Sequence, residues 1–372
     1  MRLLWGLLSF ALVFLSLAMA AEAQEKIIFD TDSGFFGDDG AALVMLARST
    51  PRILILGVTT VAGNVFPVEG AAYMLRLLEY LHVPSLPVFV GAQAPLIHTA
   101  AMAAEEDRRW GPLRYQGAFA GRATDPSNIT PRQPDRRNAV DFLSDTIERH
   151  PGEITVLALG PMTNLAIAFR LHPDVPNKIK RLIFMGGALK VPGNANRTAE
   201  FNFWFDPEAA QVVLRSAIPE KIMFGLDICN RAPLTRKLFD EIIATKTPVT
   251  ELYRQDYGER YPGFLSHPDA TAYLWDELVA ADLIDPSFVT SSETVYLDVD
   301  TRFGPNYGAS IKLDRNLAPK ATPVRVMLDL NYPRVAGLYR DLLTNTRTTE
   351  RGAKRSSIWL AVRAAPCALL SR

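Results

Sequence analysis

Short apolar runs alternate with longer amphipathic stretches along most of this 372-residue chain. The short runs have the length and the continuous apolar character of strands that are buried on both faces of a sheet. The predicted strands are residues 26–30, 53–61, 86–91, 154–160, 181–187 and 221–227. The predicted helices are residues 40–48, 68–81, 136–150, 162–171 and 206–216. This alternation predicts an α/β fold, namely an open, mostly parallel twisted sheet with helices on both faces.

The remainder of the chain fits a single domain, residues 24–350. Two added strands, residues 293–300 and 323–330, are expected near its end, and a helical pattern follows the second. The sequence contains neither an internal repeat nor a linker rich in Gly, Ser or Pro, so a second domain is not predicted. Residues 351–372 are interpreted as a loosely attached C-terminal tail.

The first residues of the chain have the pattern of a signal peptide. An almost unbroken apolar run from Leu3 to Ala20 follows Met1 and Arg2, and residues 21–23 read Ala-Glu-Ala. Small residues at this spacing are accepted by a signal peptidase, so residues 1–23 are predicted to be removed and the protein exported to the periplasm or the extracellular medium. An uncleaved membrane anchor is the alternative, since about 18 apolar residues can span a bilayer. No second run of this kind follows, so no membrane association is expected after cleavage.

The charge balance excludes two classes of partner. Lys and Arg together number 40, as do Asp and Glu, which leaves no net charge. The chain therefore lacks the basic footprint of a nucleic-acid binder, and it has no polybasic run for a membrane surface. Only Cys229 and Cys367 are present, so no disulfide framework is expected. The oligomeric state stays open, with a homo-oligomer among the alternatives.

Four carboxylates lie within ten residues at the end of the first predicted strand. Asp30 and Asp32 end the strand, and Asp38 and Asp39 follow after two glycines. Such crowding is repulsive unless a cation or hydrogen bonds compensate. Oxygen ligands at a strand end suit Ca²⁺ or Mg²⁺, and open α/β sheets bind ligands at this edge. The alternative is an acidic loop in which Asp39 caps the next helix, but it leaves the pair at the strand end unexplained.

A second polar motif occupies residues 199–210. If this segment is extended, Glu200 and Asn202 share one face, with aromatic residues on the other. A carboxylate beside an amide suits the two hydroxyls of a ribose, although a polar strand edge before a helix is the simpler interpretation. Asp206, followed by a proline, is predicted to cap a helix in a purely structural role.

Together these segments resemble the inosine-uridine-preferring nucleoside hydrolase family over residues 26–342. The resemblance rests on the aspartate cluster and on four further motifs in the family's order and spacing. These are Val61-Ala62-Gly63-Asn64, Leu159-Gly160-Pro161-Met162-Thr163-Asn164-Leu165-Ala166, Met185-Gly186-Gly187 and residues 199–210. Asp32 precedes Asp38 by six residues, two more than is usual, an expansion that some relatives share. The resemblance implies a Rossmann-like fold and hydrolysis of the N-glycosidic bond of ribonucleosides to free base and ribose.

The resemblance also implies a role for each matching residue. Asp32 would bind Ca²⁺ and act as general base on a calcium-bound water. The other calcium ligands would be Asp39, Asp276 and the main-chain oxygen of Leu159. The residues that would hold the ribose are Asp38, Asn64, Met185, Asn194, Glu200 and Asn202. These roles agree with the chemistry, because carboxylates near the sugar stabilise an oxocarbenium-like transition state and calcium lowers the pKa of water.

Trp275 departs from the pattern of many relatives, which have His before the residue that matches Asp276. A histidine at that position could protonate the leaving base, and here this acid is excluded. A subgroup that prefers purine nucleosides also has Trp there, which predicts that Trp275 stacks on a purine and that purine nucleosides are preferred. The simpler interpretation of Trp275 is a core residue on a helix. Trp204 and Trp110 are further candidates for the base pocket.

Two other functions fit part of the pattern. A phosphatase of the haloacid dehalogenase type would use Asp30 as nucleophile, but it needs a second acidic pair far down the chain and leaves Glu200 unexplained. An exported nucleoside-binding protein without turnover would keep the ribose contacts. Hydroxyl binding alone does not require Asp32, Asp39 and Asp276, which favours the enzyme.

Overall fold

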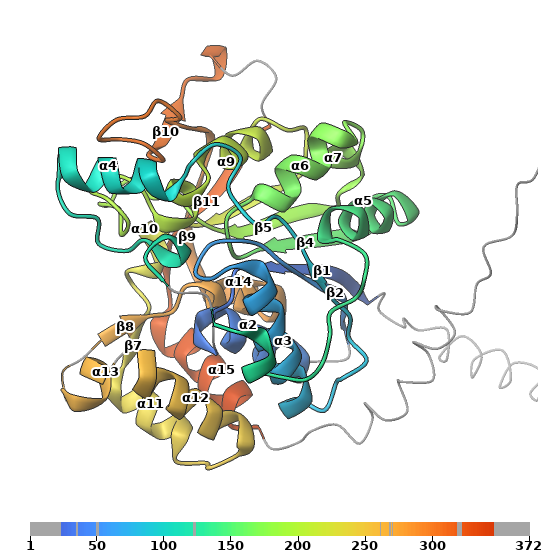
Figure 1. The fold of residues 1–372 in the computed structure, drawn as a ribbon, viewed down its shortest axis with the longest axis vertical. Coiled ribbons are helices and arrows are strands. Elements are labelled where there is room, and N and C mark those ends of the chain that lie inside the picture. The colour runs from blue at the N-terminus through green and yellow to red at the C-terminus, as the bar shows by residue number, and fades with distance from the viewer. Residues whose placement is uncertain are drawn as a thin grey trace, which may run out of the picture.

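A nine-stranded, mostly parallel sheet organises the fold and confirms the predicted α/β architecture (Figure 1). This computed structural model describes residues 24–345 apart from residues 35, 50–51, 122–123, 261, 268, 270 and 318–321. The predicted signal peptide, residues 1–23, and the predicted tail, residues 351–372, lie outside the described residues, as does Cys367.

The sheet has parallel strands at its centre and an antiparallel pair at one edge. Its strands are β1 (Glu25–Thr31), β2 (Ile53–Thr60), β3 (Val88–Val90), β4 (Ile154–Ala158), β5 (Arg181–Met185), β6 (Lys221–Phe224), β9 (Val289–Val299), β10 (Ser310–Leu313) and β11 (Val324–Leu330). Their order across the sheet is β10-β9-β11-β6-β5-β4-β1-β2-β3. Neighbours from β11 to β3 are parallel, whereas β9 pairs antiparallel with both β11 and β10.

Helices cover both faces of this sheet (Figure 1). One face carries α2 (Gly37–Arg48), α3 (Pro67–Tyr80), α14 (Asp276–Ile284) and α15 (Tyr332–Thr344). The other carries α5 (Ala139–Arg149), α6 (Thr163–Leu171), α7 (Val175–Lys178) and α9 (Pro207–Leu214). Successive residues of a strand point to opposite faces, so Leu157 of β4 packs in the core with α2 and Val156 in the core with α5. This two-sided burial explains why the central strands are continuously apolar.

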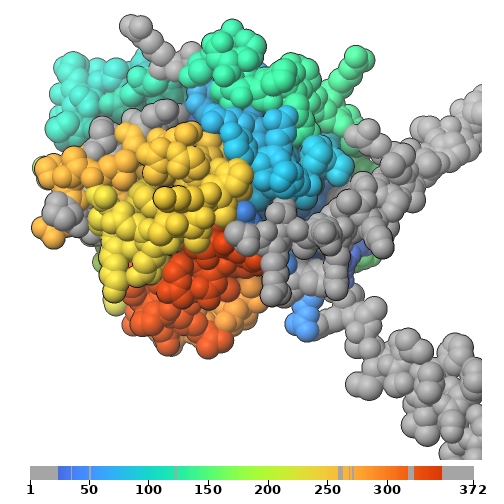
Figure 2. Space-filling model, turned by 90° about the horizontal axis from the view of Figure 1, so that it is seen from below, coloured from blue at the N-terminus to red at the C-terminus, as the bar shows by residue number. Residues whose placement is uncertain are grey.

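A smaller group of elements packs at one end of the molecule. It consists of β7 (Pro233–Thr235), α11 (Arg236–Ile243), α12 (Pro248–Arg260), α13 (Pro262–Ser266) and β8 (Thr271–Tyr273). The two strands pair antiparallel, and Figure 2 shows the helices of this group in yellow beside α15 in red and α3 in blue. The helices α4 (Ala100–Trp110) and α10 (Leu226–Cys229) follow β3 and β6. Among the described residues, no helix combines the length and apolar character needed to span a membrane.

The prediction of an extended segment around Glu200 is wrong, because residues Phe201–Phe205 form a short helix, α8. The carboxylate of Glu200 is its N-cap and accepts hydrogen bonds from the main-chain N–H groups of Asn202 (2.7 Å) and Phe203 (3.1 Å). Polar and apolar residues that alternate over only four positions do not distinguish a strand from one helical turn. A cap that satisfies the first N–H groups decides in favour of the helix.

Asp206 caps α9, as predicted, and we expect Asp206→Ala to lower the free energy of unfolding by about 2–4 kcal/mol. Its fully buried carboxylate accepts from the main-chain N–H of Ala209 (3.0 Å), from that of Leu96 (3.0 Å) and from the Thr163 hydroxyl (2.6 Å). The substitution leaves three donors without this acceptor. Urea denaturation measures the loss. Asp125→Ala is the matched control, because Asp125 caps an exposed 3₁₀ turn, and equal losses in both variants would contradict the expectation.

Candidate active site

The predicted site residues gather where the direction of chain progression across the sheet reverses. From β1 the chain adds β2 and β3 on one side, and it then returns to add β4, β5 and β6 on the other. Asp32 directly follows β1, so it lies at this reversal, between the carboxyl ends of β2 and β4. Such a switch point is where open α/β sheets leave a crevice for a ligand.

Three carboxylates form the centre of the site. Asp38 and Asp39 lie in the first turn of α2, and Asp276 is the first residue of α14, which packs against α2. One oxygen from each of the three carboxylates lies within 4.8 Å of the others. This cluster of side-chain oxygens includes Asp38, which the sequence analysis assigned to the ribose, and it does not include Asp32. Asp39 is further fixed by a hydrogen bond that its carboxylate accepts from the hydroxyl of Thr31.

Burial and mutual repulsion raise the pKa values of the acidic groups at this site. For Asp32, Asp39 and Asp276 the largest cause is loss of water around a buried carboxylate. Neighbouring charge raises the pKa further: the charge of Asp38 acts on Asp32 and Asp276, and that of Asp32 acts on Asp39. No Lys or Arg occurs in the sequence from residue 29 to residue 44 to offset these charges. This stretch of the chain therefore supplies no counter-charge for the carboxylates, which makes their ionised forms less favourable.

The donor set fits a divalent cation with a preference for oxygen ligands. Oδ1 of Asp276 is buried and has no hydrogen-bond partner among the described residues. Glu277, which the sequence analysis did not single out, is also buried, and its Oε1 likewise lacks a partner in the described part of the chain. Carboxylate oxygens in this number suit Ca²⁺ or Mg²⁺ better than metals that favour sulfur or imidazole. The sequence did not indicate Glu277 as a site residue, because a single Glu in a helical pattern belongs to no motif.

Asp32 and Asn64 form a directly bonded pair. The main-chain N–H of Asn64 donates to Oδ2 of Asp32 (2.8 Å), and the Asn64 side-chain amide donates to Oδ1 (3.2 Å). Both oxygens of Asp32 are thus held by one loop, the turn after β2. Gly63 must be glycine, because a Cβ there would lie 2.0 Å from Oδ2 of Asp32. The tertiary structure brings these two predicted site residues together, although 31 residues separate them in the sequence.

Asn202 brings together two other predicted residues. Its side-chain amide donates to the carbonyl oxygen of Leu159 (2.9 Å) and to that of Met185 (3.2 Å). Leu159 follows β4, and its main-chain N–H continues the ladder to Asp30 (2.8 Å), so its carbonyl is fixed at the sheet edge. The carboxylate of Glu200 accepts from Gly187 N–H (2.8 Å) as well as capping α8. The ends of β4 and β5 and the start of α8 therefore meet around these polar groups.

The predicted ribose residue Asn194 lies in the loop before α8. Its side-chain oxygen accepts from the main-chain N–H of Phe201 (2.8 Å), the first residue of that helix. The side chain of Asn194 is partly exposed, whereas those of Glu200 and Asn202 are buried. This hydrogen bond ties the loop to the helix that Glu200 caps.

The tryptophan candidates differ in their surroundings. Trp275 is partly buried at the N-terminus of α14, where its main-chain N–H donates to Glu277 (2.9 Å). Its indole nitrogen is buried without a partner among the described residues. Trp204 is fully buried in an aromatic cluster, and its indole N–H donates to Glu106 (2.8 Å). A ring with no accessible surface cannot stack on a ligand, so the structure contradicts the predicted contact of Trp204 with the base. Trp110, on α4, packs instead against Phe303.

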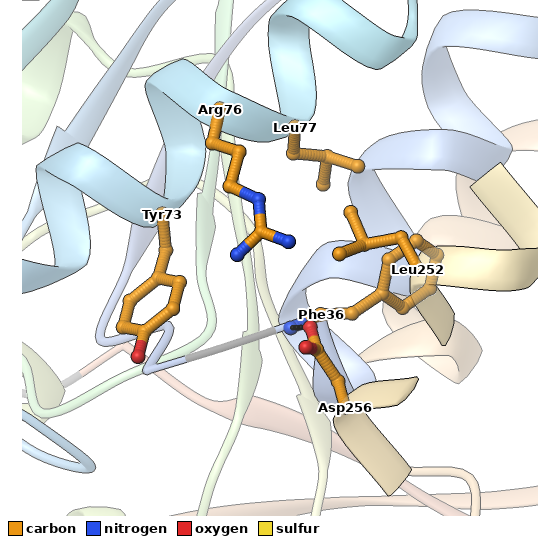
Figure 3. A pocket seen from close by; sticks show the side chains of 6 residues that line it. All are labelled: Phe36, Tyr73, Arg76, Leu77, Leu252 and Asp256. Carbon is orange, nitrogen blue, oxygen red and sulfur yellow. Dashed lines mark hydrogen bonds between the residues drawn. The ribbon is translucent and has the colours of Figure 1, made fainter. Parts of the chain in front are cut away.

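The two-residue expansion of the aspartate loop is braced by the small helical group. The carboxylate of Asp256 on α12 accepts from the main-chain N–H of Phe36 (2.7 Å). Figure 3 shows the hollow at this junction, which is lined by Phe36, Tyr73, Arg76, Leu77, Leu252 and Asp256. None of the predicted site residues lines it. Gly37, which follows, has a positive φ of 38°, a conformation that favours glycine and directs the chain into α2. The expansion is thus accommodated without separating Asp38 and Asp39 from Asp276.

A buried amide supports the floor of the site. The side chain of Asn164 donates to the carboxylate of Asp30 (2.7 Å) and to the carbonyl of Thr60 (3.1 Å), while its oxygen accepts from Ala92 N–H (2.8 Å). Thr59 donates to the same carboxylate oxygen of Asp30 (2.5 Å). Asp30 is fully buried in this network, which excludes it as the exposed nucleophile of a phosphatase.

The fold and the site define the class: an α/β enzyme with buried carboxylates and amides at the carboxyl edge of a parallel sheet. The chain belongs to the inosine-uridine preferring nucleoside hydrolase family, whose model matches residues 27–337. It is 30% identical over 312 residues to the pyrimidine-specific ribonucleoside hydrolase RihB of Escherichia coli O17:K52:H18 (strain UMN026 / ExPEC), which covers 83% of this chain and 94% of that protein.

Solved structures of nucleoside hydrolases have the same fold. The plant nucleoside hydrolase PpNRh1 superposes with a TM-score of 0.70 at 26% identity, over 86% of this chain and 99% of that one. A purine-preferring ribonucleoside hydrolase from Gardnerella vaginalis superposes with a TM-score of 0.69 at 25% identity, over 86% and 98% of the two chains. These likenesses confirm the family, the fold and the class of enzyme that the sequence motifs predicted.

Proposed function

We propose that this nucleoside hydrolase is exported, depends on calcium, uses Asp32 as its general base and prefers purine nucleosides. The observation that carries the proposal is the cluster of Asp38, Asp39 and Asp276 beside Asp32, at the edge of the sheet where the ribose-suited groups Glu200 and Asn202 also lie. Export is supported by the signal-peptide pattern of residues 1–23.

The ribose would be held by groups that the fold has already oriented. Asn64, Asn194, Glu200 and Asn202 offer amide donors and carboxylate acceptors for hydroxyl groups, and the thioether of Met185 would pack on the sugar. Fixed hydroxyl contacts orient the anomeric carbon relative to the attacking water, which contributes to the rate through positioning. The negative charge of the surrounding carboxylates favours the positive charge that develops on the sugar ring.

The calcium ligands would be Asp32, Asp39, Asp276 and the main-chain oxygen of Leu159, with Asp38 close enough to be a fourth carboxylate. A bound divalent cation would orient water and lower its pKa. Asp32 would then take the proton from that water, and the two hydrogen bonds from Asn64 would keep its carboxylate in one orientation.

Trp275 supports the preference for purines. An aromatic ring stacked on a purine favours protonation at N7 during departure, because a π face stabilises a nearby cation. No histidine occupies the position before Asp276 to protonate a pyrimidine directly. The half-buried ring of Trp275 adjoins Asp276 and therefore lies beside the proposed cation site.

We expect inosine and guanosine to be cleaved at least about tenfold more efficiently than uridine, as judged by kcat/KM, and Trp275→Ala to remove most of this difference. A screen of purified protein against purine and pyrimidine nucleosides, with release of free base as the readout, measures both. Trp110→Ala is the matched control, since Trp110 packs against Phe303. A preference for pyrimidine nucleosides, as the name of the similar hydrolase RihB states for that enzyme, would contradict the proposal. Cleavage of uridine as efficient as that of inosine would contradict it as well.

The same screen separates the alternative functions. Nucleoside binding without release of base would identify a binding protein, and release of phosphate from a phosphomonoester would identify a phosphatase. Release of free base supports the proposed hydrolase.

A further inference from the structure

The segment of residues 92–120, here called the bridging segment, joins two loops that carry predicted ribose contacts. Its helix α4 contributes Glu106, which is buried and accepts from the indole N–H of Trp204 (2.8 Å) and from the side-chain amide of Asn196 (2.8 Å). The N–H of Arg114 donates to the carbonyl of Ala195 (2.8 Å). The bridging segment is therefore fixed to the loop that carries Asn194.

The bridging segment is equally fixed to the loop that carries Asn64. The N–H of Ala118 donates to the carbonyl of Gly63 (2.8 Å). Gly117 has a positive φ of 52°, and a Cβ there would lie 2.4 Å from the oxygen of Gly63. Only glycine permits this approach of the two backbones. Tyr115 lies between Arg114 and Gly117, and its side chain faces the loop that carries Asn64.

Tyr115 contacts the loop that carries Asn64 and the start of helix α8. Its hydroxyl donates to the side-chain oxygen of Asn64 (2.8 Å), and its ring lies 4.7 Å from that of Phe201, centre to centre. The residue is 42% exposed, so one side of the ring faces solvent. Tyr115 is absent from the set of residues that the sequence motifs indicated, because it lies in a loop without any motif.

The carboxylate of Asp32, which only accepts hydrogen bonds, and the hydroxyl of Tyr115 together hold the amide of Asn64 in one orientation. A side-chain amide can rotate by half a turn and exchange its oxygen for its nitrogen. With the oxygen accepting from Tyr115, the nitrogen donates to Oδ1 of Asp32 (3.2 Å). The opposite orientation would set an amide oxygen against the Asp32 carboxylate, although the tyrosine hydroxyl can accept from an N–H₂ group. The carboxylate therefore selects the orientation, and the bond from Tyr115 restrains rotation of the amide.

We propose that Tyr115 is a positioning residue that holds the Asn64 amide in the orientation that donates to Asp32. The chain of hydrogen bonds runs from an exposed tyrosine through Asn64 to the buried carboxylate that acts as base. This inference rests on the proposed function, because its effect on turnover depends on Asp32 being that base. Through Tyr115 and Asn64 the bridging segment thus contributes to the geometry of the Asp32 carboxylate.

Tyr115→Phe tests the inference, because it removes the hydroxyl and keeps the ring against Phe201. We expect kcat for the best nucleoside to fall about three- to tenfold, the effect of one lost hydrogen bond, with KM changed less than about twofold. The melting temperature should stay within about 2 °C of the wild-type value, since the anchors at Glu106 and Ala118 remain. Tyr80→Phe is the matched control, because Tyr80 is a similarly exposed tyrosine on α3 and should have no effect.

A double-mutant cycle distinguishes positioning through Asn64 from direct contact with substrate. In an Asn64→Ala background the Tyr115→Phe substitution should change kcat less than about twofold, because the group it orients is gone. An undiminished effect in that background, or a rise in KM at constant kcat, would overturn the role of Asn64 as intermediary. If the wild-type protein releases base and the Tyr115→Phe variant has the same kcat, this inference is overturned and the proposed function stands. A wild-type protein that releases no base would overturn the proposed function and, with it, this inference.

Discussion

Replacing Asp32 by asparagine is expected to lower kcat for nucleoside hydrolysis by about a thousandfold, within the range that general-base catalysis contributes. The amide can still offer an oxygen and accept the main-chain hydrogen bond from Asn64, so the loop after β2 should keep its place. It cannot take a proton from water. Steady-state release of free base, with ribose-analogue binding as a second readout, separates loss of chemistry from loss of binding.

Asp282→Asn is the matched control for this substitution. Asp282 is a buried carboxylate further along α14, outside the acidic cluster, so its loss should leave kcat within about threefold of wild type. An Asp32→Asn variant that retains a tenth or more of wild-type turnover would show that another group is the base. Asp38 would be the first to examine, because its charge raises the pKa of Asp32 and its carboxylate therefore lies close to that residue.

Removal of divalent cations is expected to abolish turnover and to lower the melting temperature by about 5–10 °C, because only the folded chain assembles the ligands. The carboxylates raise one another's pKa values in the absence of a cation, so the metal-free site is electrostatically strained. Calcium added back should restore both properties. Differential scanning fluorimetry and base-release assays, with and without a chelator, give the two measurements.

Asp276→Asn makes this experiment specific to the cluster. The substitution removes one of the mutually repelling charges, so the metal-free variant should melt above the metal-free wild type and gain little from calcium. A metal-free wild type with full activity would exclude the cation from the reaction. A calcium-dependent rise in melting temperature that persists unchanged in Asp276→Asn would locate the cation elsewhere.

The repeated pattern of apolar runs was sufficient to predict the fold class. Residues 154–160 and 181–187 are apolar at nearly every position, and the structure buries β4 and β5 between two helical layers. A strand that is buried on both faces leaves this mark in the sequence, because each position contacts a core. The Asp206 cap could also be predicted from the sequence, because a helix N-cap depends on residues within one turn.

Segments without such local constraints were not predicted or were predicted wrongly. The alternation at Glu200 and Asn202 was interpreted as extended, yet Glu200 caps the short helix α8. The sequence did not indicate a role for the bridging segment, which includes α4. The buried position of Glu106 depends on its contacts with Trp204 and Asn196. A buried carboxylate is recognisable only from its partners, and these lie far away in the sequence.

The sequence alone was sufficient to predict the sheet and the family and to indicate candidate site residues, because strand burial and short motifs are encoded in neighbouring positions. How those residues combine became visible only in the folded chain. Asp38 and Asp39 lie near Asp276 because α2 packs against α14. Trp204 is fully buried. Tyr115 is linked through Asn64 to Asp32. Distances between side chains on different elements depend on packing over the whole domain, and no local pattern of residues records them.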